Sequence, residues 1–306
     1  MRLITDEDVA SLLTMREAIA AMAAAFEQFG NGAGAIAPRV RASARQRDQA
    51  VAIAMMGAAL PTAGVVGAKV YSTVAGRFSF VIVLFSATSG EPLAAIEANE
   101  LTRFRTAAAT AVAMQRLAAR DARTLALFGT GVQARAHAEA LLLAHPFEQV
   151  RVAGRTTAPE FANWIQTEFG VAAGAVDAAA AVREADVIVT ATRATEPLFD
   201  GVQVKAGTFV AAVGSSKPEA REIDDALLAR AELIVVEWLP AAQAEAGEFV
   251  RAAPGTIDPA RVTELGKLLV RGTSYRRRAG DIVVYKSVGI GLEDVALAHL
   301  VYERCG

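Results

Sequence analysis

The chain has very little of what disulfide and metal chemistry require. Its 306 residues include one cysteine, Cys305, and three histidines, His137, His145 and His299. A single cysteine excludes an intramolecular disulfide and a thiolate metal cluster, and the histidines form no ligand-like pair. We therefore expect no bound metal.

Neither sign of charge dominates, and long apolar runs are missing. The 31 Lys and Arg against 33 Asp and Glu leave a net charge of −2, which offers no electrostatic footprint for nucleic acid or an anionic membrane. No apolar run approaches the roughly 18 residues of a membrane helix. The start, MRLITDEDV, lacks the basic stretch and apolar core of a signal peptide. We expect a cytoplasmic protein with small-molecule partners.

The chain does have apolar material for two packed cores, with 53% hydrophobic residues. The pairs Thr5/Asp8 and Thr14/Glu17 have the spacing of capping boxes and predict two N-terminal helices. Residues 39–101 then form short β-type runs separated by turn residues, which predicts an antiparallel sheet. The N-terminal region is therefore expected to be α+β.

Residues 123–235 alternate short strands with helical stretches, after a long Ala-rich helix that begins at Asn99. The runs TLALF, QVRVA, DVIVTA, TFVAAV and ELIVV are apolar on both faces, as buried parallel strands are. The pattern predicts an α/β fold with a Rossmann-type doubly wound parallel sheet over 120–287. A final helix at 292–302 is expected to return to the first domain.

A glycine-rich loop, GTGVQA at 129–134, follows the first of these strands and opens a helix. The first glycine permits a tight turn, the second lets the backbone approach a pyrophosphate, and the helix N-terminus offers amides to the anion. The loop predicts dinucleotide binding, and a purely structural turn is the alternative. The expected contacts here are Gly129, Thr130, Gly131, Val132 and Gln133.

The second strand, QVRVA, is followed by Gly154, Arg155 and Thr156, where an NAD enzyme usually carries Asp or Glu for the ribose 2′-hydroxyl. A guanidinium suits a 2′-phosphate instead. We therefore expect NADP(H) to be preferred, with NAD(H) as the alternative. In that alternative Arg155 is an ordinary solvated loop residue.

Basic residues interrupt apolar surroundings at three places. Lys69 lies within the strand-like VVGAKVYSTV, and either reaches water at a strand end or faces a polar cleft. Arg105 lies among small residues in LTRFRTAAATA, where a guanidinium can grip a carboxylate, although a surface arginine such as Arg103 is the plainer interpretation. Arg39 and Arg41 lead into the predicted sheet.

Six segments together resemble the ornithine cyclodeaminase/mu-crystallin family in order and spacing, across essentially the whole chain. These segments are Pro38–Val40, Gly67–Lys69, Leu101–Ala108, Gly129–Ala134, Val213–Asp224 and Tyr285–Asp294. The resemblance implies a substrate-binding and dimerisation domain built from both chain ends, 1–119 and 288–306, a dinucleotide-binding domain at 120–287, and a homodimer.

The resemblance also assigns roles. Lys69 matches the lysine that faces the substrate at the nicotinamide, and Arg105 matches the arginine that binds the substrate carboxylate. Arg39, with Arg41 as the alternative, corresponds to a second carboxylate ligand. The further positions expected to contact the cofactor are Thr106, Thr192, Val213, Gly214, Ser287 and Gly289.

One departure from the family pattern matters for the reaction. Ser216 stands where cyclodeaminases and related alanine dehydrogenases carry a catalytic Asp, and residues 52–56 lack a second cyclodeaminase acid. Without these carboxylates the acid–base steps of ornithine deamination have no group to perform them. The serine version resembles the family's imine-reducing branch. Here we expect Lys69 to orient the imine and deliver a proton, and Ser216 to hold a water.

The resemblance therefore implies an NAD(P)H-dependent reductase of small cyclic ketimine carboxylates, such as 1-pyrroline-2-carboxylate or 1-piperideine-2-carboxylate, that forms cyclic L-amino acids. Three alternatives remain at this point. They are an NAD-dependent ornithine cyclodeaminase, an alanine or N-alkyl-amino-acid dehydrogenase, and a non-enzymatic binding protein.

Overall fold

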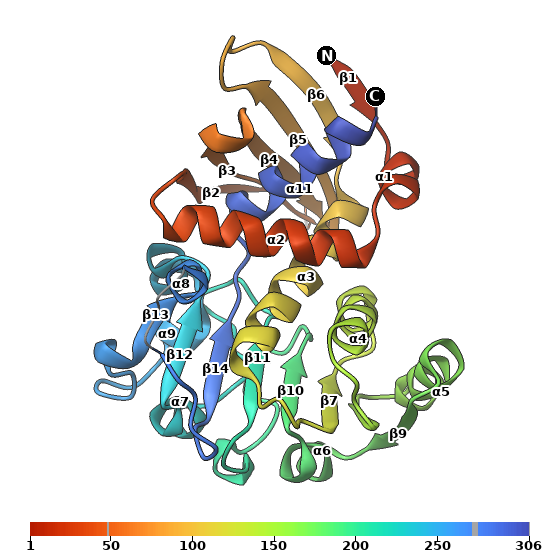
Figure 1. Ribbon diagram of the computed structural model, residues 1–306, viewed down its shortest axis with the longest axis vertical. Helices are drawn as coiled ribbons and strands as arrows, with labels where there is room; N and C mark the ends of the chain where they lie inside the picture. Colours follow the sequence, from red (N-terminus) through yellow and green to blue (C-terminus); the bar gives the residue numbers. More distant parts are fainter. Residues whose placement is uncertain (48, 271–274, 306) are drawn as a thin grey trace. The chain divides into compact units, whose positions relative to one another are not determined.

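The computed structural model describes residues 1–47, 49–270 and 275–305 (Figure 1). The chain forms two compact units, unit 1 of Met1–Ala109 with Gly289–Gly306 and unit 2 of Thr110–Val288. The sequence-based boundaries lay at 119/120 and 287/288. The first differs by ten residues because α3 (Asn99–Leu117) runs without a break from one unit into the other, so no loop marks the division.

Unit 1 contains a six-stranded sheet in the order β1-β6-β5-β4-β3-β2. All neighbours are antiparallel except β1 and β6. The sheet confirms the expected α+β character of this region. Its strands are β1 (Arg2–Ile4), β2 (Ala35–Gln46), β3 (Gln49–Leu60), β4 (Val65–Val74), β5 (Arg77–Ser86) and β6 (Pro92–Glu97), with a 3-10 turn η1 (Pro61–Ala63) between β3 and β4.

Helices α1 (Asp6–Leu12), α2 (Met15–Gly30) and α11 (Gly291–Arg304) belong to the same unit. Both predicted capping boxes are present at the starts of α1 and α2. The C-terminal helix α11 packs against β3, β4 and α2, and this packing brings residues from the two ends of the chain together (Figure 1).

No single helix in the described part of the chain is long and apolar enough to cross a membrane. Helices α1 and α2 reach the length and composition of a membrane-spanning helix only when they are counted as one segment, and they meet at a bend of 91°.

Unit 2 contains an eight-stranded sheet in which every pair of neighbours is parallel, in the order β13-β12-β14-β11-β10-β7-β8-β9. The order runs outward in both directions from β7 and β10, which confirms the doubly wound Rossmann-type fold. The strands are β7 (Thr124–Phe128), β8 (Gln149–Ala153), β9 (Ala172–Val176), β10 (Val187–Thr190), β11 (Phe209–Ala212), β12 (Leu233–Val236), β13 (Val262–Glu264) and β14 (Val283–Lys286).

The helical elements of unit 2 include several very short ones. The stretch GTIDPARVTELGKLL contains a 3-10 turn, the strand β13 and a five-residue helix. The elements are α4 (Val132–Ala144), α5 (Ala158–Phe169), α6 (Ala178–Glu184), η2 (Gly201–Gln203), α7 (Asp225–Arg230), α8 (Leu239–Glu245), α9 (Gly247–Val250), η3 (Pro259–Arg261) and α10 (Leu265–Leu269).

Candidate active site

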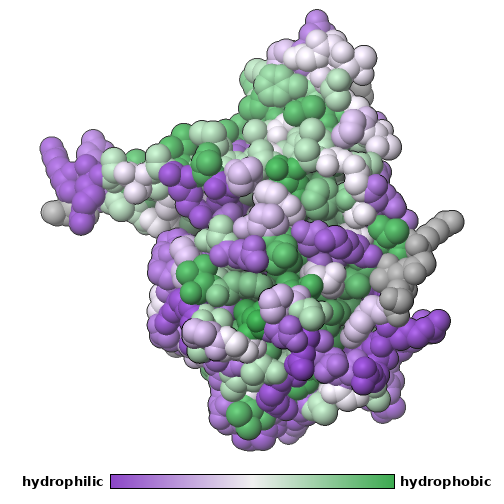
Figure 2. Space-filling view, turned by 90° about the vertical axis from the view of Figure 1, so that its left-hand side faces the viewer, coloured by the Kyte–Doolittle hydropathy of each residue, from purple (hydrophilic) through white to green (hydrophobic). Residues whose placement is uncertain are grey.

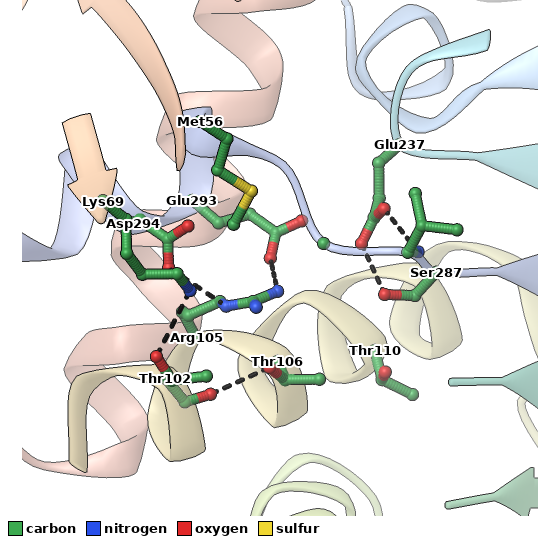
Figure 3. A network of polar contacts seen from close by, with 12 residues as sticks. Met56, Lys69, Thr102, Arg105, Thr106, Thr110, Glu237, Ser287, Glu293 and Asp294 are labelled. Atoms are coloured by element: carbon green, nitrogen blue, oxygen red, sulfur yellow. Dashed lines mark hydrogen bonds and ion pairs between the residues drawn. The ribbon is translucent and has the colours of Figure 1, made fainter. Parts of the chain in front are cut away.

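Four charged side chains are buried together in unit 1 (Figure 3). Lys69 from β4 is 1% exposed and Arg105 from α3 is 6% exposed, while Glu293 and Asp294 at the start of α11 are fully buried. Buried charges are rare in proteins and are nearly always paired. The two sequence-predicted residues thus belong to one charge cluster, which we call the unit 1 cluster.

Lys69 lies on the face of the sheet that α11 covers. Its Nζ donates to Asp294 Oδ1 at 2.7 Å and to Thr102 Oγ1 at 3.3 Å, and it lies 5.0 Å from the centre of the Phe80 ring. Of the two interpretations of Lys69 from sequence, the strand end in water is wrong, because the side chain is buried among polar partners.

Arg105 is held by both carboxylates of α11. Its Nη1 donates to Glu293 Oε2 at 2.6 Å, and its Nε lies 3.3 Å from Asp294 Oδ1. Gly289 lies directly against the guanidinium with a φ of +72°, and a Cβ atom at that position would overlap Arg105. Only glycine permits both the backbone conformation and this close approach.

Arg39 of β2 is half-buried and reaches the same part of unit 1. Its Nη2 donates to the carbonyl of Gly289 at 2.7 Å and lies 3.1 Å from Met56 Sδ. Arg41 is exposed. The structure therefore favours Arg39 over Arg41 as the second basic residue beside Arg105.

A third basic residue, Arg39, adds positive charge beside the unit 1 cluster. Lys69 and Arg105 are paired with the carboxylates of Glu293 and Asp294, and Arg39 brings a third positive charge to the carbonyl of Gly289. Burial, together with the charges of Arg105 and Arg39, lowers the pKa of Lys69 to about 7, against the attraction and hydrogen bond of Asp294. The arrangement suits an anionic ligand and a proton donor active near neutral pH.

The glycine-rich loop of unit 2 fits a dinucleotide. Gly129, after β7, has a φ of +109°, and a Cβ there would lie 2.6 Å from the Ala191 carbonyl oxygen. Gly131 caps α4 without a side-chain hydrogen bond to the first amides of the helix, and the space beside its Cα is open. A helix N-terminus of this kind binds phosphate.

The other residues expected around the loop lie nearby in unit 2. Thr130 is hydrogen-bonded to Thr157, with 2.6 Å between their hydroxyl oxygens. Val132 is 64% exposed and Gln133 is half-buried at the start of α4. Three exposed residues follow β8, namely Gly154, Arg155 and Thr156.

A buried carboxylate, Glu222, organises the next part of unit 2. Its Oε1 accepts from the backbone N–H and the hydroxyl of Thr192, and its Oε2 accepts from the Thr190 hydroxyl and the Gly214 N–H, all at 2.7 Å. The carboxylate thus holds two positions expected to contact the cofactor, Thr192 and Gly214. Val213 precedes Gly214 and donates its N–H to the Thr190 carbonyl.

Ser287 is held in the same way by Glu237, which is 1% exposed. The Ser287 hydroxyl donates to Glu237 Oε1 at 2.5 Å, and the Val288 N–H donates to Oε2 at 2.9 Å. Because the Ser287 proton is used in this bond, its oxygen presents lone pairs to any further partner.

Two remaining candidates lie in less distinctive surroundings. Ser216 is half-buried in the loop after β11. Thr106 is 7% exposed on α3 and donates its hydroxyl proton to the Thr102 carbonyl at 2.8 Å. Neither the position of Ser216 nor the contact of Thr106 by itself indicates a catalytic role.

Sequence reasoning missed the buried acids Glu222, Glu237, Glu293 and Asp294. Glu237 directly follows the apolar strand run LIVV, a charge in apolar surroundings of the kind that drew attention to Lys69. Glu293 and Asp294 gave no such signal, because acidic residues are ordinary in the first turn of an exposed helix.

Comparisons with known proteins identify the family of this chain. The model of the ornithine cyclodeaminase/mu-crystallin family matches residues 2–306. A Delta(1)-pyrroline-2-carboxylate reductase from Bacillus cereus is 38% identical over 229 residues, which cover 73% of this chain and 70% of that protein.

Two solved structures have the same fold over the whole chain. A probable ornithine cyclodeaminase from Bordetella pertussis Tohama I is 44% identical, with a TM-score of 0.95, and covers 100% of this chain and 97% of its own. The Delta(1)-pyrroline-2-carboxylate reductase of Thermococcus litoralis, in complex with NADH and L-proline, is 28% identical with a TM-score of 0.92, at 100% and 97% coverage.

Proposed function

Because the chain belongs to the ornithine cyclodeaminase/mu-crystallin family, we propose that it is an NAD(P)H-dependent reductase of small cyclic ketimine carboxylates. Substrates of this class are 1-pyrroline-2-carboxylate and 1-piperideine-2-carboxylate, and the products are cyclic L-amino acids. The observation that carries the proposal is the unit 1 cluster, in which a lysine with a pKa of about 7 lies beside two arginines. The Bacillus cereus and Thermococcus litoralis relatives are both named Delta(1)-pyrroline-2-carboxylate reductase.

The arginines bind the substrate carboxylate in this proposal. The Arg105 guanidinium is oriented by Glu293 and Asp294, and Arg39 is oriented by the Gly289 carbonyl. A carboxylate supplies negative charge to these arginines, and charge-assisted hydrogen bonds to guanidinium groups are strong in buried surroundings. Binding in this way fixes the position of the adjacent C=N bond.

Lys69 supplies the proton. Reduction of a neutral imine adds a hydride at carbon and a proton at nitrogen, and the Lys69 ammonium gives up that proton and becomes a neutral amine. With a pKa of about 7, the lysine is a competent acid at neutral pH. Ser216 holds a water, as expected of a serine in place of the family's catalytic Asp. The bound nicotinamide supplies the hydride.

Unit 2 holds the cofactor. The loop at Gly129 and Gly131 with the start of α4 takes the pyrophosphate, and Ser287, aligned by Glu237, presents an acceptor oxygen. Arg155 after β8 is exposed and suits a ribose 2′-phosphate, so NADP(H) is preferred over NAD(H). Thr192 and Gly214, which are held in place by Glu222, complete the proposed cofactor-binding surface.

Ornithine cyclodeamination is the second candidate, since the Bordetella pertussis relative is named a probable enzyme of that kind. It requires an acid–base carboxylate at position 216, by resemblance to the cyclodeaminases, and Ser216 has none. The reductase needs only a positioned hydride and one proton.

A homodimer fits the exposed face of the unit 1 sheet. Val40, Met55, Val66, Val81 and Phe85 lie on the face opposite Lys69, and each is between 38% and 53% exposed. Figure 2 shows apolar side chains gathered on the surface of unit 1. Burying such a face against a second copy provides an apolar interface core. Light scattering with Phe85→Asp as the disrupting variant tests this assembly.

The function itself is tested with a substrate panel. The purified chain is incubated with cyclic ketimine carboxylates, pyruvate plus ammonia, or ornithine, each with NADPH, NADH or NAD, and the nicotinamide absorbance is followed. We expect NADPH oxidation with the cyclic ketimines. Ammonia and proline formation from ornithine without net cofactor change would instead identify a cyclodeaminase.

A further inference from the structure

We propose that Asp294 is the positioning residue for Lys69, holding the ammonium protonated and leaving one of its N–H groups for the substrate nitrogen. The inference rests on the proposed reductase function. It assigns a carboxylate of unit 1 to support the proton-transfer step, in a chain that carries serine at the position of the family's catalytic Asp.

The hydrogen bonds of Lys69 leave one of its N–H donors for a ligand. An ammonium has three N–H donors. In the described part of the chain two of them have partners, Asp294 Oδ1 at 2.7 Å and Thr102 Oγ1 at 3.3 Å. These two bonds fix the rotation of the ammonium. The third N–H is therefore available to the nitrogen of a bound imine.

The second oxygen of Asp294 is equally informative. Oδ2 is buried and accepts no hydrogen bond from any described residue, whereas Oδ1 faces Lys69 Nζ and Arg105 Nε. A buried carboxylate oxygen without a donor is costly. A bound substrate that gains an N–H on reduction, or a water, provides the donor that Oδ2 lacks.

The balance of charge at Lys69 depends on Asp294. Burial disfavours the ammonium, and the nearby cations Arg105 and Arg39 disfavour it further. Asp294 is the group that favours it, by charge and by hydrogen bond, while Glu293 on the same helix is engaged by Arg105 Nη1. Removing the Asp294 charge therefore lowers the pKa of Lys69 below about 7.

Lys69 is the acid in the proton-transfer step. The Lys69 N–H bond breaks, its electron pair stays on the lysine nitrogen, and the proton joins the substrate nitrogen as the hydride reaches the carbon. Lys69 is left neutral beside the ionised Asp294, which favours the return of a proton from water to the lysine before the next turnover.

The test is a direct titration of Lys69 by NMR in the cofactor-free chain. The sequence has only five lysines, so ¹³Cε/¹⁵Nζ-labelled lysine gives a simple spectrum in which the signal lost in Lys69→Arg is assigned. We expect a midpoint near pH 7 in the wild type and about 6 or below in Asp294→Asn. Asp294→Glu, which keeps the charge, restores the midpoint toward the wild-type value.

The matched control is Glu303→Gln, which removes a carboxylate from the exposed end of the same helix, where it faces His299. This variant leaves the Lys69 midpoint unchanged. An unchanged midpoint in folded Asp294→Asn would overturn the proposal.

A wild-type measurement covers the case in which Asp294→Asn does not fold. The carboxyl carbon of Asp294 should shift with the same midpoint as Lys69, and an Asp294 signal that is flat through that range would also overturn the proposal.

The kinetic prediction separates this inference from the proposed function. Asp294→Asn should lower kcat for ketimine reduction at least tenfold at pH 8, with a smaller loss at pH 6, because less of its Lys69 is protonated at the higher pH. If the wild type reduces no ketimine but Asp294→Asn still lowers the Lys69 midpoint, the function is wrong and the pairing stands.

Discussion

Glu293 and Asp294 of unit 1 and Glu222 of unit 2 are all buried carboxylates, but they are satisfied in opposite ways. Unit 2 also holds a buried ion pair, in which Lys286 Nζ lies 3.0 Å from Glu248 Oε2. In unit 1, Glu293 and Asp294 face the cations Lys69 and Arg105. In unit 2, Glu222 accepts four hydrogen bonds from neutral donors, two hydroxyls and two backbone N–H groups. A carboxylate held by neutral donors in this way is part of the framework.

The difference indicates which unit responds to ligand charge. An anion entering the unit 1 cluster changes its charge balance and the protonation of Lys69, because charged neighbours affect the pKa of that lysine. Glu222 has no such freedom, because its four donors fix its geometry. Under the proposed function, the unit 1 cluster performs the chemistry, and Glu222 belongs to the framework that positions the cofactor in unit 2.

The largest effect is expected from Arg105→Leu. Loss of the charge-assisted contacts to the substrate carboxylate should cost about 2–4 kcal/mol and raise KM for the ketimine by about thirtyfold to a thousandfold. NADPH affinity, measured by fluorescence titration, should stay nearly unchanged. Arg103→Leu is the matched control, because it removes a half-buried arginine that lies two residues before Arg105 and is paired with Glu100. Equal losses of cofactor and substrate binding would contradict the division between the units.

Cofactor choice is expected to depend on Arg155 of unit 2. Arg155→Asp adds repulsion against a 2′-phosphate and gives the 2′-hydroxyl of NADH an acceptor. The ratio of kcat/KM for NADPH to that for NADH should swing by about 3 kcal/mol, or more than a hundredfold. Arg123→Asp, at the opposite end of β7, should leave the ratio unchanged. A wild type that already prefers NADH would refute the role of Arg155.

A third prediction concerns acid stability. His137 is fully buried, and burial lowers its pKa from 6.5 to about 4. Its Nδ1 lies 2.7 Å from the Gln133 carbonyl, which can only accept, so Nδ1 carries the proton and Nε2 accepts from the Thr110 hydroxyl at 3.0 Å. The folded state thus binds fewer protons than the unfolded state between pH 4 and 6.5, and stability falls as the pH falls through that window.

The loss should reach about 3 kcal/mol at pH 4, since one pKa unit corresponds to about 1.4 kcal/mol. Urea unfolding of the wild type and of His137→Gln at a series of pH values measures it. The variant is expected to be less stable at pH 7 and less sensitive to pH between 6.5 and 4. Parallel pH profiles for the two proteins would show that His137 is not the group responsible.

The smallest effect is expected from Glu222→Gln. The amide NH₂ cannot accept from Thr190 and Gly214, or from Thr192, and the variant should lose about 2 kcal/mol of unfolding free energy. Weaker NADPH binding should accompany the loss, with KM for the ketimine less affected. Glu219→Gln, an exposed neighbour, should change neither quantity.

The parts of the fold that sequence predicted are those with a local signal. The capping boxes at Thr5 and Thr14 and the doubly apolar strand runs depend on neighbouring residues only, and the structure confirms them. The strand β9 has an alanine-rich, partly exposed sequence, and β13 has three residues, so neither showed a strand pattern.

The candidate site was predicted only in part, for the same reason. Charges in apolar or small-residue surroundings drew attention to Lys69 and Arg105, and the family resemblance supplied their expected roles. Asp294 is 225 residues from Lys69 in sequence, and only the packing of α11 on β4 brings the two together. Long-range pairing of this kind leaves no local signal.

The most direct test of the central claim is the rate of NADPH oxidation with 1-pyrroline-2-carboxylate, compared with proline formation from ornithine and NAD by the same preparation. The account predicts ketimine reduction by the wild type, strongly reduced in Arg105→Leu, and no ammonia released from ornithine. Robust ornithine turnover, or ketimine reduction that is unaffected by Arg105→Leu, would contradict it.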